Sequence, residues 1–202
     1  MRVLNGNAED MLRALRCGDV DFVIGLVREP SQPDLVNEAV AETPYVVVAR
    51  HGHPLAGKRK VTLEDLAEYD WVVGTPGSHR RSRFEGLFDA KRRPTARIAT
   101  GSLPIIRVLL AQSDRLTLLT TYELMFEDDA LIAVPFGPIE PVPAVGLTMR
   151  ENWLPTQLQR NFLDLIQKRI VGSLSVTKDL AKELRNIGLP FHEYQADQNQ
   201  SV

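Results

Sequence analysis

Short polar segments stand in front of four predicted helices, and each of them follows a predicted strand. They are Gly6-Asn7, Thr75-Pro76-Gly77-Ser78, Gly101-Ser102 and Thr120-Thr121. The start of a helix carries unpaired backbone N–H groups and about half a positive charge, which suits a carboxylate, a phosphate or a sugar hydroxyl. Several such starts at the carboxyl ends of strands predict a cleft for a small polar or anionic ligand.

Ordinary helix capping is the competing interpretation of the same residues. Ser, Thr and Asn precede helices in all globular proteins, because their side chains accept hydrogen bonds from the first-turn amides. For any one of these residues alone, capping is the favoured interpretation. Only their convergence on one cleft would favour contact with a ligand.

The sequence offers no pair of residues that would support catalysis. His51-x-His53 resembles a metal-binding spacing, but it stands in a Gly/Pro turn without Cys or a carboxylate cluster, so we expect a solvent-exposed turn. Nucleophile-elbow, Walker, HExxH and dinucleotide motifs do not occur. The single Cys17 excludes an intramolecular disulfide, and we expect it to be partly buried. We therefore expect no enzyme, no metal and no cofactor.

A basic stretch runs from His79 to Arg97. It holds seven Lys and Arg residues against Glu85 and Asp89. A nucleic-acid patch is conceivable, but no aromatic platform and no recognition-helix pattern accompany the charges, so a solvated helix face is the favoured interpretation. A further hypothesis is that an arginine at the cleft mouth pairs with an anionic ligand, the candidates being Arg80, Arg81 and Arg83.

Composition limits the class of protein. A chain of 202 residues with 44% hydrophobic and 25% charged residues is typical of one or two globular domains. The formal net charge of −2 gives no general attraction to nucleic acid. No apolar run approaches the roughly 18 residues that span a bilayer. The segment 1–6 is too short and too polar for the apolar core of a signal peptide. We expect a cytoplasmic protein without membrane contact.

Strand and helix patterns alternate along the chain, which predicts an α/β protein with mostly parallel sheets. Helices are predicted from Asn7, Thr62, Ser78, Ser102, Tyr122 and Thr156. The strand at 22–26 is a nearly continuous apolar run, of the kind that is buried on both faces of a parallel sheet. The other predicted strands are 2–4, 35–43, 45–49, 71–73, 96–100, 116–119, 131–136 and 144–150.

The last thirty residues differ from the rest. Residues 177–187 have the spacing of an extra helix, with Gly188 as its stop, and the composition beyond Pro190 is polar. We therefore treat residues 171–202 as a C-terminal extension with a possible helix and then disorder.

The ordered series of these segments resembles the effector-binding domain of LysR-type transcriptional regulators. Each segment is weak evidence alone, but the series in order is specific, and it covers residues 2–170. The stretches 45–56, 76–88 and 101–119 are most similar to the branch named for a galactose-binding-protein regulator. The residues that carry the resemblance are Gly6-Asn7-Ala8-Glu9-Asp10, Asp21-Phe22-Val23-Ile24-Gly25, Val46-Val47-Val48-Ala49, His53-Pro54-Leu55-Ala56, Leu63 to Leu66, Trp71 to Val73, Gly101-Ser102 and Leu116 to Leu119.

The resemblance implies two Rossmann-like subdomains joined by crossover strands, the type 2 periplasmic-binding-protein fold. Residues 1–43 and 145–170 would form subdomain I, and 44–144 subdomain II with the crossovers. A small effector, a sugar or an organic acid, would bind between them and shift their orientation. The predicted ligand-binding residues are Asn7, Gly25, Leu26, Thr75, Ser78, Ser102, Leu103, Thr120 and Thr121.

The sequence departs from the family pattern at its N-terminus. The family's winged helix-turn-helix, linker helix and first strand and helix are not found ahead of Arg2, so subdomain I is expected to be truncated. DNA contact and homo-oligomerisation are accordingly expected only of a complete regulator.

Two other functions fit the same cleft. A periplasmic-type solute-binding protein predicts an export signal in the DNA upstream, where a regulator predicts helix-turn-helix codons. A free-standing enzyme of two α/β subdomains should turn its ligand over.

Overall fold

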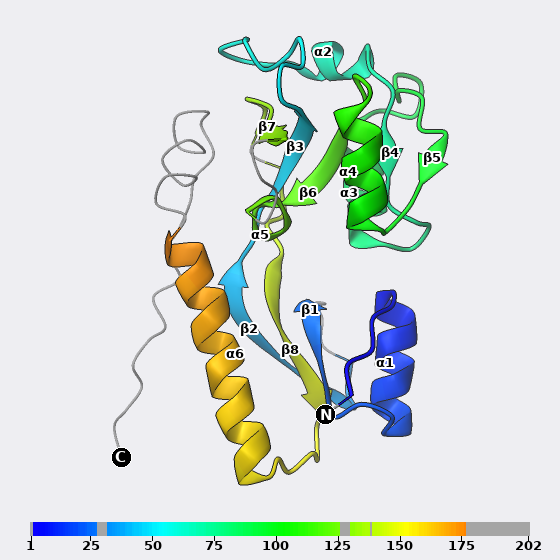
Figure 1. The fold of residues 1–202 in the computed structure, drawn as a ribbon. Helices are drawn as coiled ribbons and strands as arrows, with labels where there is room; N and C mark the ends of the chain where they lie inside the picture. Colours follow the sequence, from blue (N-terminus) through cyan, green and yellow to red (C-terminus); the bar gives the residue numbers. More distant parts are fainter. Residues whose placement is uncertain (1, 28–31, 126–129, 138, 177–202) are drawn as a thin grey trace.

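The computed structural model describes residues 2–27, 32–125, 130–137 and 139–176. They form two lobes, one above the other in Figure 1, connected by extended segments. In chain order the elements are α1 (Ala8–Cys17), β1 (Phe22–Leu26), β2 (Leu35–Glu42), β3 (Tyr45–Arg50), α2 (Leu63–Ala67), β4 (Val72–Val73), α3 (His79–Leu87), β5 (Ile98–Ala99), α4 (Leu103–Ala111), β6 (Thr117–Thr120), α5 (Thr121–Leu124), β7 (Leu131–Ala133), β8 (Ala144–Arg150) and α6 (Gln157–Val176).

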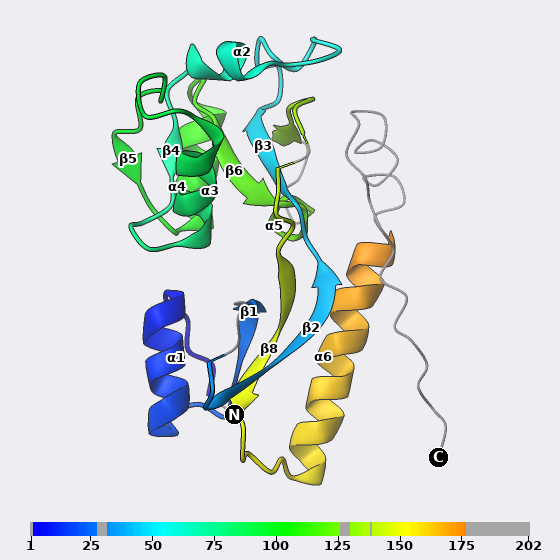
Figure 2. The same cartoon turned by 180° about the vertical axis from the view of Figure 1, so that it is seen from behind.

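The lower lobe is a three-stranded sheet in the order β1-β8-β2, with α1 and α6 on opposite sides in both ribbon views (Figures 1 and 2). Alternation along the strands sets the two faces. Phe22 packs in the cluster that contains Leu147 of β8 and Leu163 of α6. Val23, the next residue, packs with Leu15 of α1. The lobe therefore has a hydrophobic core on each face of the sheet.

The upper lobe follows the same rule around β3. Val46 and Val48 pack with Ile106 and Leu110 of α4, while Val47 packs on the opposite face with residues of α3. That second face also holds Trp71, whose ring lies 5.1 Å from Phe84 between centroids. The run 45–49 is buried throughout because both faces of β3 are covered.

The expectation of mostly parallel sheets is wrong. Both ladders of β8 and both ladders of β3 are antiparallel. Within the described residues, parallel pairing occurs between β4 and β5 and at the bridge from Trp71 to Leu116. The pattern of apolar residues reports burial and not strand direction, and the strands that cross between the lobes pair antiparallel with their neighbours.

Smaller predictions fail for related reasons. Residues 2–4 form no strand, and β1 is only half-buried, with Ile24 45% exposed, because its sole partner strand in the described part of the chain is β8. Cys17 is exposed, since α1 buries only the face that carries Leu12 and Leu15. The predicted helix at 177–187 lies outside the described residues.

Three helix starts follow the predicted capping. Asn7 and Thr62 each accept a hydrogen bond from the third residue of their helix, and Thr62 completes a capping box with Asp65. Thr156 and Gln159 exchange the equivalent bonds ahead of α6. No helix in the described ranges is long and apolar enough to span a membrane.

The lobes meet where the crossover segments run side by side. The Thr43 amide donates to the Pro143 carbonyl at 2.8 Å, and the Thr121 amide donates to the Pro44 carbonyl at 2.9 Å. The buried Thr43 hydroxyl accepts from the Tyr122 amide at 3.0 Å and lies 3.3 Å from the Thr121 hydroxyl. The start of α5 is thus bonded directly to the segment that leads from β2 to β3.

The turn after β3 differs from the exposed turn that we expected, because His53 is buried while His51 is exposed. The His53 ring lies 4.6 Å from Tyr69 between centroids. Its Nδ1 accepts from the Leu55 amide at 3.1 Å, which leaves Nε2 to donate to the Asp114 carbonyl at 3.2 Å. Burial lowers the pKa of His53, and Arg50 lowers it further, although the Asp114 carbonyl opposes them.

We expect His53 to make stability fall on acidification. Its pKa is lower in the folded state than in the unfolded chain, so its contribution is complete above the unfolded value of about 6.5 and is lost as the pH falls through the folded pKa. Urea unfolding from about pH 7 to about pH 5 should show a slope of at most about 1.4 kcal/mol per pH unit from this group. The slope should shrink in His53→Gln and persist in the exposed control His51→Gln. An unchanged slope in His53→Gln would refute the assignment.

Candidate functional site

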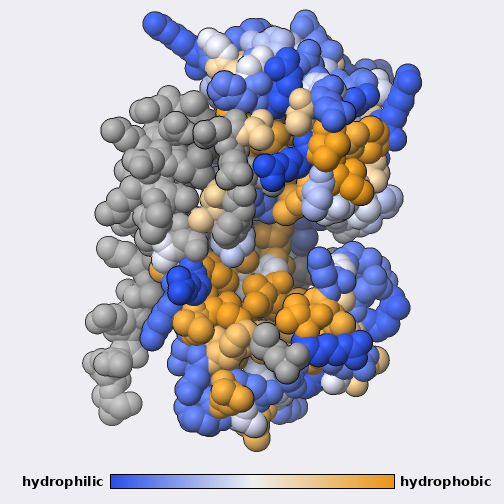
Figure 3. Space-filling view, in the orientation of Figure 1, coloured by the Kyte–Doolittle hydropathy of each residue, from blue (hydrophilic) through white to orange (hydrophobic). Residues whose placement is uncertain are grey.

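Three strand ends of the upper lobe open at one edge of its sheet. The strands β5, β4 and β6 run in the same direction, since β4 pairs parallel with β5 and a parallel bridge joins Trp71 to Leu116. Their carboxyl ends lead into α4, α3 and α5. This edge faces the lower lobe, where the start of α1 and the end of β1 point back at it (Figure 1), and the surface is hollowed between the lobes (Figure 3).

The loop from Gly74 to Ser78 is tight at one of its glycines and has a left-handed backbone at the other. A Cβ on Gly74 would lie 2.3 Å from the Ser78 hydroxyl, and Gly77 has φ +77°. The Ser78 hydroxyl donates to the Thr75 carbonyl at 2.7 Å and accepts from the Arg81 amide at 3.3 Å. Ser78 is therefore a helix cap in this structure, whereas the Thr75 side chain is exposed.

Ser102 differs from the other predicted hydroxyls because it makes no side-chain bond to the first turn of its helix. Its own amide donates to the Thr100 hydroxyl at 3.1 Å. The following Leu103 packs against the α4 face of the core, and Pro104 has no amide hydrogen. The start of α4 is thus left without a side-chain cap at the edge that faces the lower lobe.

Thr120 and Thr121 are buried and have partners within the protein. The Thr120 hydroxyl donates to Glu123 Oε2 at 3.1 Å and accepts from the Glu123 amide at 3.2 Å, and the Thr120 amide donates to the same carboxylate oxygen at 2.8 Å. This is a capping box. The Thr121 hydroxyl contacts Thr43 as described above, so it belongs to the crossover.

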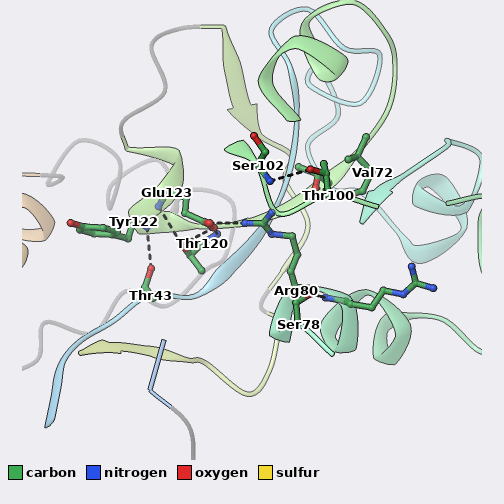
Figure 4. Close-up of polar contacts among 11 residues, drawn as sticks. Thr43, Val72, Ser78, Arg80, Thr100, Ser102, Thr120, Tyr122 and Glu123 are labelled. Atoms are coloured by element: carbon green, nitrogen blue, oxygen red, sulfur yellow. Dashed lines mark hydrogen bonds and ion pairs between the residues drawn. The ribbon is translucent and has the colours of Figure 1, made fainter. Parts of the chain in front are cut away.

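Arg80 connects α3 to α5. Its Nη2 donates to Glu123 Oε1 at 2.6 Å, and Figure 4 shows the side chain extending from α3 to Glu123. The side chain of Arg80 is 11% exposed and that of Glu123 24% exposed. For Arg80 the expected solvated helix face is therefore wrong, because its guanidinium turns toward α5 and not toward solvent. Arg81 does stay local and pairs with Glu85 at 2.6 Å on its own helix.

Two buried nitrogen atoms of this helix, Nε of Arg80 and Nε of Arg83, have no hydrogen-bond partner among the residues that the structure describes. Tyr45 lies close to both residues and to Glu123. Burial raises the pKa of Tyr45 to about 12, Glu123 raises it as well, and Arg80 and Arg83 oppose the change. The phenol therefore stays neutral at all physiological pH values, and the charges of the cluster are those of two arginines and one glutamate.

The opposite wall holds the remaining predicted residues. Asn7 is exposed and its side chain is engaged with Asp10, whose amide it accepts at 2.9 Å. A Cβ on Gly25 would meet open space within 4 Å. Leu26 packs against the upper-lobe cluster that contains Tyr45, so it connects the two lobes. Asn7, Gly25 and Leu26 thus lie on elements that face the six predicted residues of the upper lobe.

Glu123 and Tyr45 were not among the predicted site residues. The spacing of Thr120 and Glu123 is that of a capping box and was open to detection. Nothing local marks Tyr45 as a neighbour of the two arginines, since it comes from a different element. In the described ranges there is no group of three or more His, Cys, Asp or Glu residues that would hold a metal ion.

The chain matches the family described as LysR substrate binding domain over residues 1–170. It therefore belongs to the family of LysR-type effector-binding domains, as the ordered segments predicted. Among curated relatives it is 34% identical over 158 residues to the HTH-type transcriptional regulator GalR of Pseudomonas putida, covering 75% of this chain and 40% of that protein. It is 30% identical over 145 residues to the regulator CfxR of Cupriavidus necator, covering 69% of this chain and 45% of that protein.

The chain thus spans less than half the length of these two curated relatives, both of which are named as transcriptional regulators. Solved structures agree on the fold. The Synechocystis PCC6803 CcmR regulatory domain in complex with 2-PG superposes with a TM-score of 0.69 at 22% identity, covering 81% of this chain and 80% of that one. The effector-binding domain of QuiR in complex with shikimate gives 0.65 at 17% identity, covering 81% and 78%.

Proposed function

We propose that this chain is the sensor of a transcriptional regulator and binds a small polar or anionic metabolite between its two lobes. The ligand would contact Ser102 and Thr75, with Leu103, Ser78, Thr120 and Thr121 behind them. Asn7, Gly25 and Leu26 would form the opposite wall. The observation that carries the proposal is the start of α4, which has no side-chain cap and opens at the edge facing the lower lobe.

Two further observations support a polar ligand. The start of a helix attracts acceptors and negative charge, and α3 and α4 both begin at this edge. Two structural neighbours hold a small molecule, 2-PG in one and shikimate in the other. A sugar or an organic acid is therefore the class of effector that we propose.

The response would be a change in the relative orientation of the lobes. We take residues 1–43 with 145–170 and residues 44–144 as the two bodies, and 171–202 as an extension outside them. The hydrogen bonds between Thr43, Tyr122 and Pro143 mark where they would pivot. A ligand that binds both lobes would favour the closed arrangement, because only that arrangement lets it make all its contacts.

In the complete protein the sensor would act through parts beyond this domain. We propose a cytoplasmic regulator that contacts DNA through a helix-turn-helix domain and assembles with copies of itself. The exposed face of α4 is a candidate for that assembly, since Ile105 and Val108 of this helix are 51% and 56% exposed. The regulator names of the curated relatives support this over a solute-binding protein.

Thermal unfolding with a panel of sugars and organic acids, shikimate included, tests the proposal. A ligand at a hundred times its Kd is expected to add about 2.7 kcal/mol of stability. Ser102→Ala should raise the Kd of the ligand about tenfold, because it removes a hydrogen bond to the ligand. Ser113→Ala makes the same change at the other end of α4 and should leave the Kd unchanged. An equal Kd in wild type and Ser102→Ala would refute the placement of the ligand.

A further inference from the structure

Two arginines of α3, Arg80 and Arg83, each have a buried nitrogen that lacks a hydrogen-bond acceptor among the described residues. Arg80 donates from Nη2 to Glu123, while its buried Nε has no partner in the described part of the chain. Arg83 follows at i+3 on the same helix, and its buried Nε likewise has no partner there. A buried donor of a charged group that lacks an acceptor costs stability, so an uncommitted pair of them is unusual in a folded protein.

The charge around these arginines is also unbalanced. Glu123 is the carboxylate that pairs with Arg80, and no ion pair joins Arg83 to a carboxylate within the described residues. Tyr45, which interacts electrostatically with Arg80, Arg83 and Glu123, stays neutral. Within the described residues the two guanidinium groups therefore have one ion-paired carboxylate between them, which leaves one positive charge that suits an anion.

Glu123 holds Arg80 with only one of its two oxygens. Oε1 contacts the guanidinium, while Oε2 accepts from the Thr120 amide and hydroxyl in the capping box. The carboxylate can therefore release Arg80 and keep its place at the start of α5. Releasing Arg80 would break one ion pair and would leave the helix cap intact.

We propose that the effector is an anion, with a carboxylate or a phosphate that displaces Glu123 from Arg80 and also binds Arg83. Glu123 is then an internal competitor that occupies the anion position while the domain is empty. An oxyanion offers at least two acceptors, which match the unpartnered Nε atoms as well as the freed Nη2. A neutral sugar supplies acceptors without balancing the charge. This inference rests on the proposed function and narrows it to acids.

The displacement would also reach the crossover. Glu123 lies on α5, whose first residues contact Thr43. The Thr43 hydroxyl is 3.3 Å from the Thr121 hydroxyl and 3.0 Å from the Tyr122 amide. The carboxylate that leaves Arg80 is therefore next in sequence to the residues of α5 that contact Thr43 of the segment joining the lobes. Replacement of the Glu123 carboxylate by the effector at Arg80 would therefore act on α5, the helix that is hydrogen-bonded to the segment joining the lobes.

Binding of defined probes to matched variants tests the inference. The probes are shikimate, citrate and inorganic phosphate as anions, and galactose and glucose as neutral sugars, measured by calorimetry with the 202-residue chain. Glu123→Gln removes the competing charge and keeps the capping box, in which Gln serves as well as Glu. This variant is expected to lower the Kd of the anion about tenfold. Arg80→Gln is expected to raise that Kd at least about thirtyfold.

The controls come from the neighbouring pair on the same helix. Arg81→Gln and Glu85→Gln break an ion pair of the same length, 2.6 Å, that does not reach α5, and should leave the anion's Kd unchanged. An anion bound equally well by Arg80→Gln, or more weakly by Glu123→Gln, overturns the inference. Binding of a neutral sugar alone, weakened by Ser102→Ala, overturns the inference and leaves the proposed function standing. Failure of every probe to bind counts against both.

Discussion

Gly146→Ala is expected to lower the free energy of unfolding by about 3 kcal/mol or more, because strand β8 has no room for a side chain there. A Cβ on Gly146 would lie 2.1 Å from the Glu38 carbonyl oxygen, 2.7 Å from Val27 and 3.0 Å from the Cα of Ala39. Two of the three atoms belong to the backbone of β2, beside the register shift between Ala39 and Ala41. Relief therefore requires the β2–β8 ladder to separate, and chemical denaturation would measure the loss.

Two glycines serve as controls for this prediction. Gly25 is paired with Gly146 in the neighbouring ladder, and a Cβ there meets nothing within 4 Å. Gly172 lies in α6 with equally open space. Gly25→Ala should be neutral or slightly stabilising, and Gly172→Ala should add up to about 1 kcal/mol through helix propensity. A stability for Gly146→Ala within about 1 kcal/mol of wild type would contradict the close packing of these strands.

Arg150→Met is expected to cost about 2–3 kcal/mol, the second largest effect that we predict. Arg150 stands at the end of β8, and its Nη1 donates to the carbonyls of Leu15 and Val20, the latter at 2.9 Å. Leu15 belongs to the last turn of α1, where a cation also favours the helix dipole. Methionine keeps most of the aliphatic bulk and removes the charged donor, so the measured loss would report these bonds.

Arg13→Met is the matched control, because Arg13 lies on the same helix α1 and is exposed. Its guanidinium is 3.9 Å from Glu9 and 3.5 Å from Asp10, and its side chain is 68% exposed. Exposed pairs of this kind contribute less than about 1 kcal/mol. If Arg150→Met and Arg13→Met unfolded at the same denaturant concentration, Arg150 would not anchor α1 to the sheet.

Much of the local structure follows from local pattern. Asn7 and Thr62 cap their helices as predicted, and Gly18 ends α1 with φ +77°. The run at 45–49 is a buried strand, as its β-branched residues indicate. These features depend on neighbours within a few residues, and such neighbours are visible in the sequence.

The candidate site was predictable only in part. The polar segments before α3, α4 and α5 do meet at one edge, because their strands run in one direction. Which hydroxyls are occupied was not predictable, since Ser78 and Thr120 are used within the protein while Ser102 is not engaged in capping. The expected solvated helix face was wrong for Arg80, which pairs with Glu123, whereas Arg81 stays partly exposed and pairs with Glu85 on its own helix.

By itself, the sequence determined the family, the order of strands and helices, and the residues that begin the helices, because each is written in spacing and residue type along a short stretch of chain. Tertiary structure alone decided the direction of the strands around β3 and β8, the burial of His53, and the meeting of Arg80 with Glu123 across 43 residues of sequence. These depend on which distant segments pack together, and a carboxylate that neutralises a buried arginine can come from any of them.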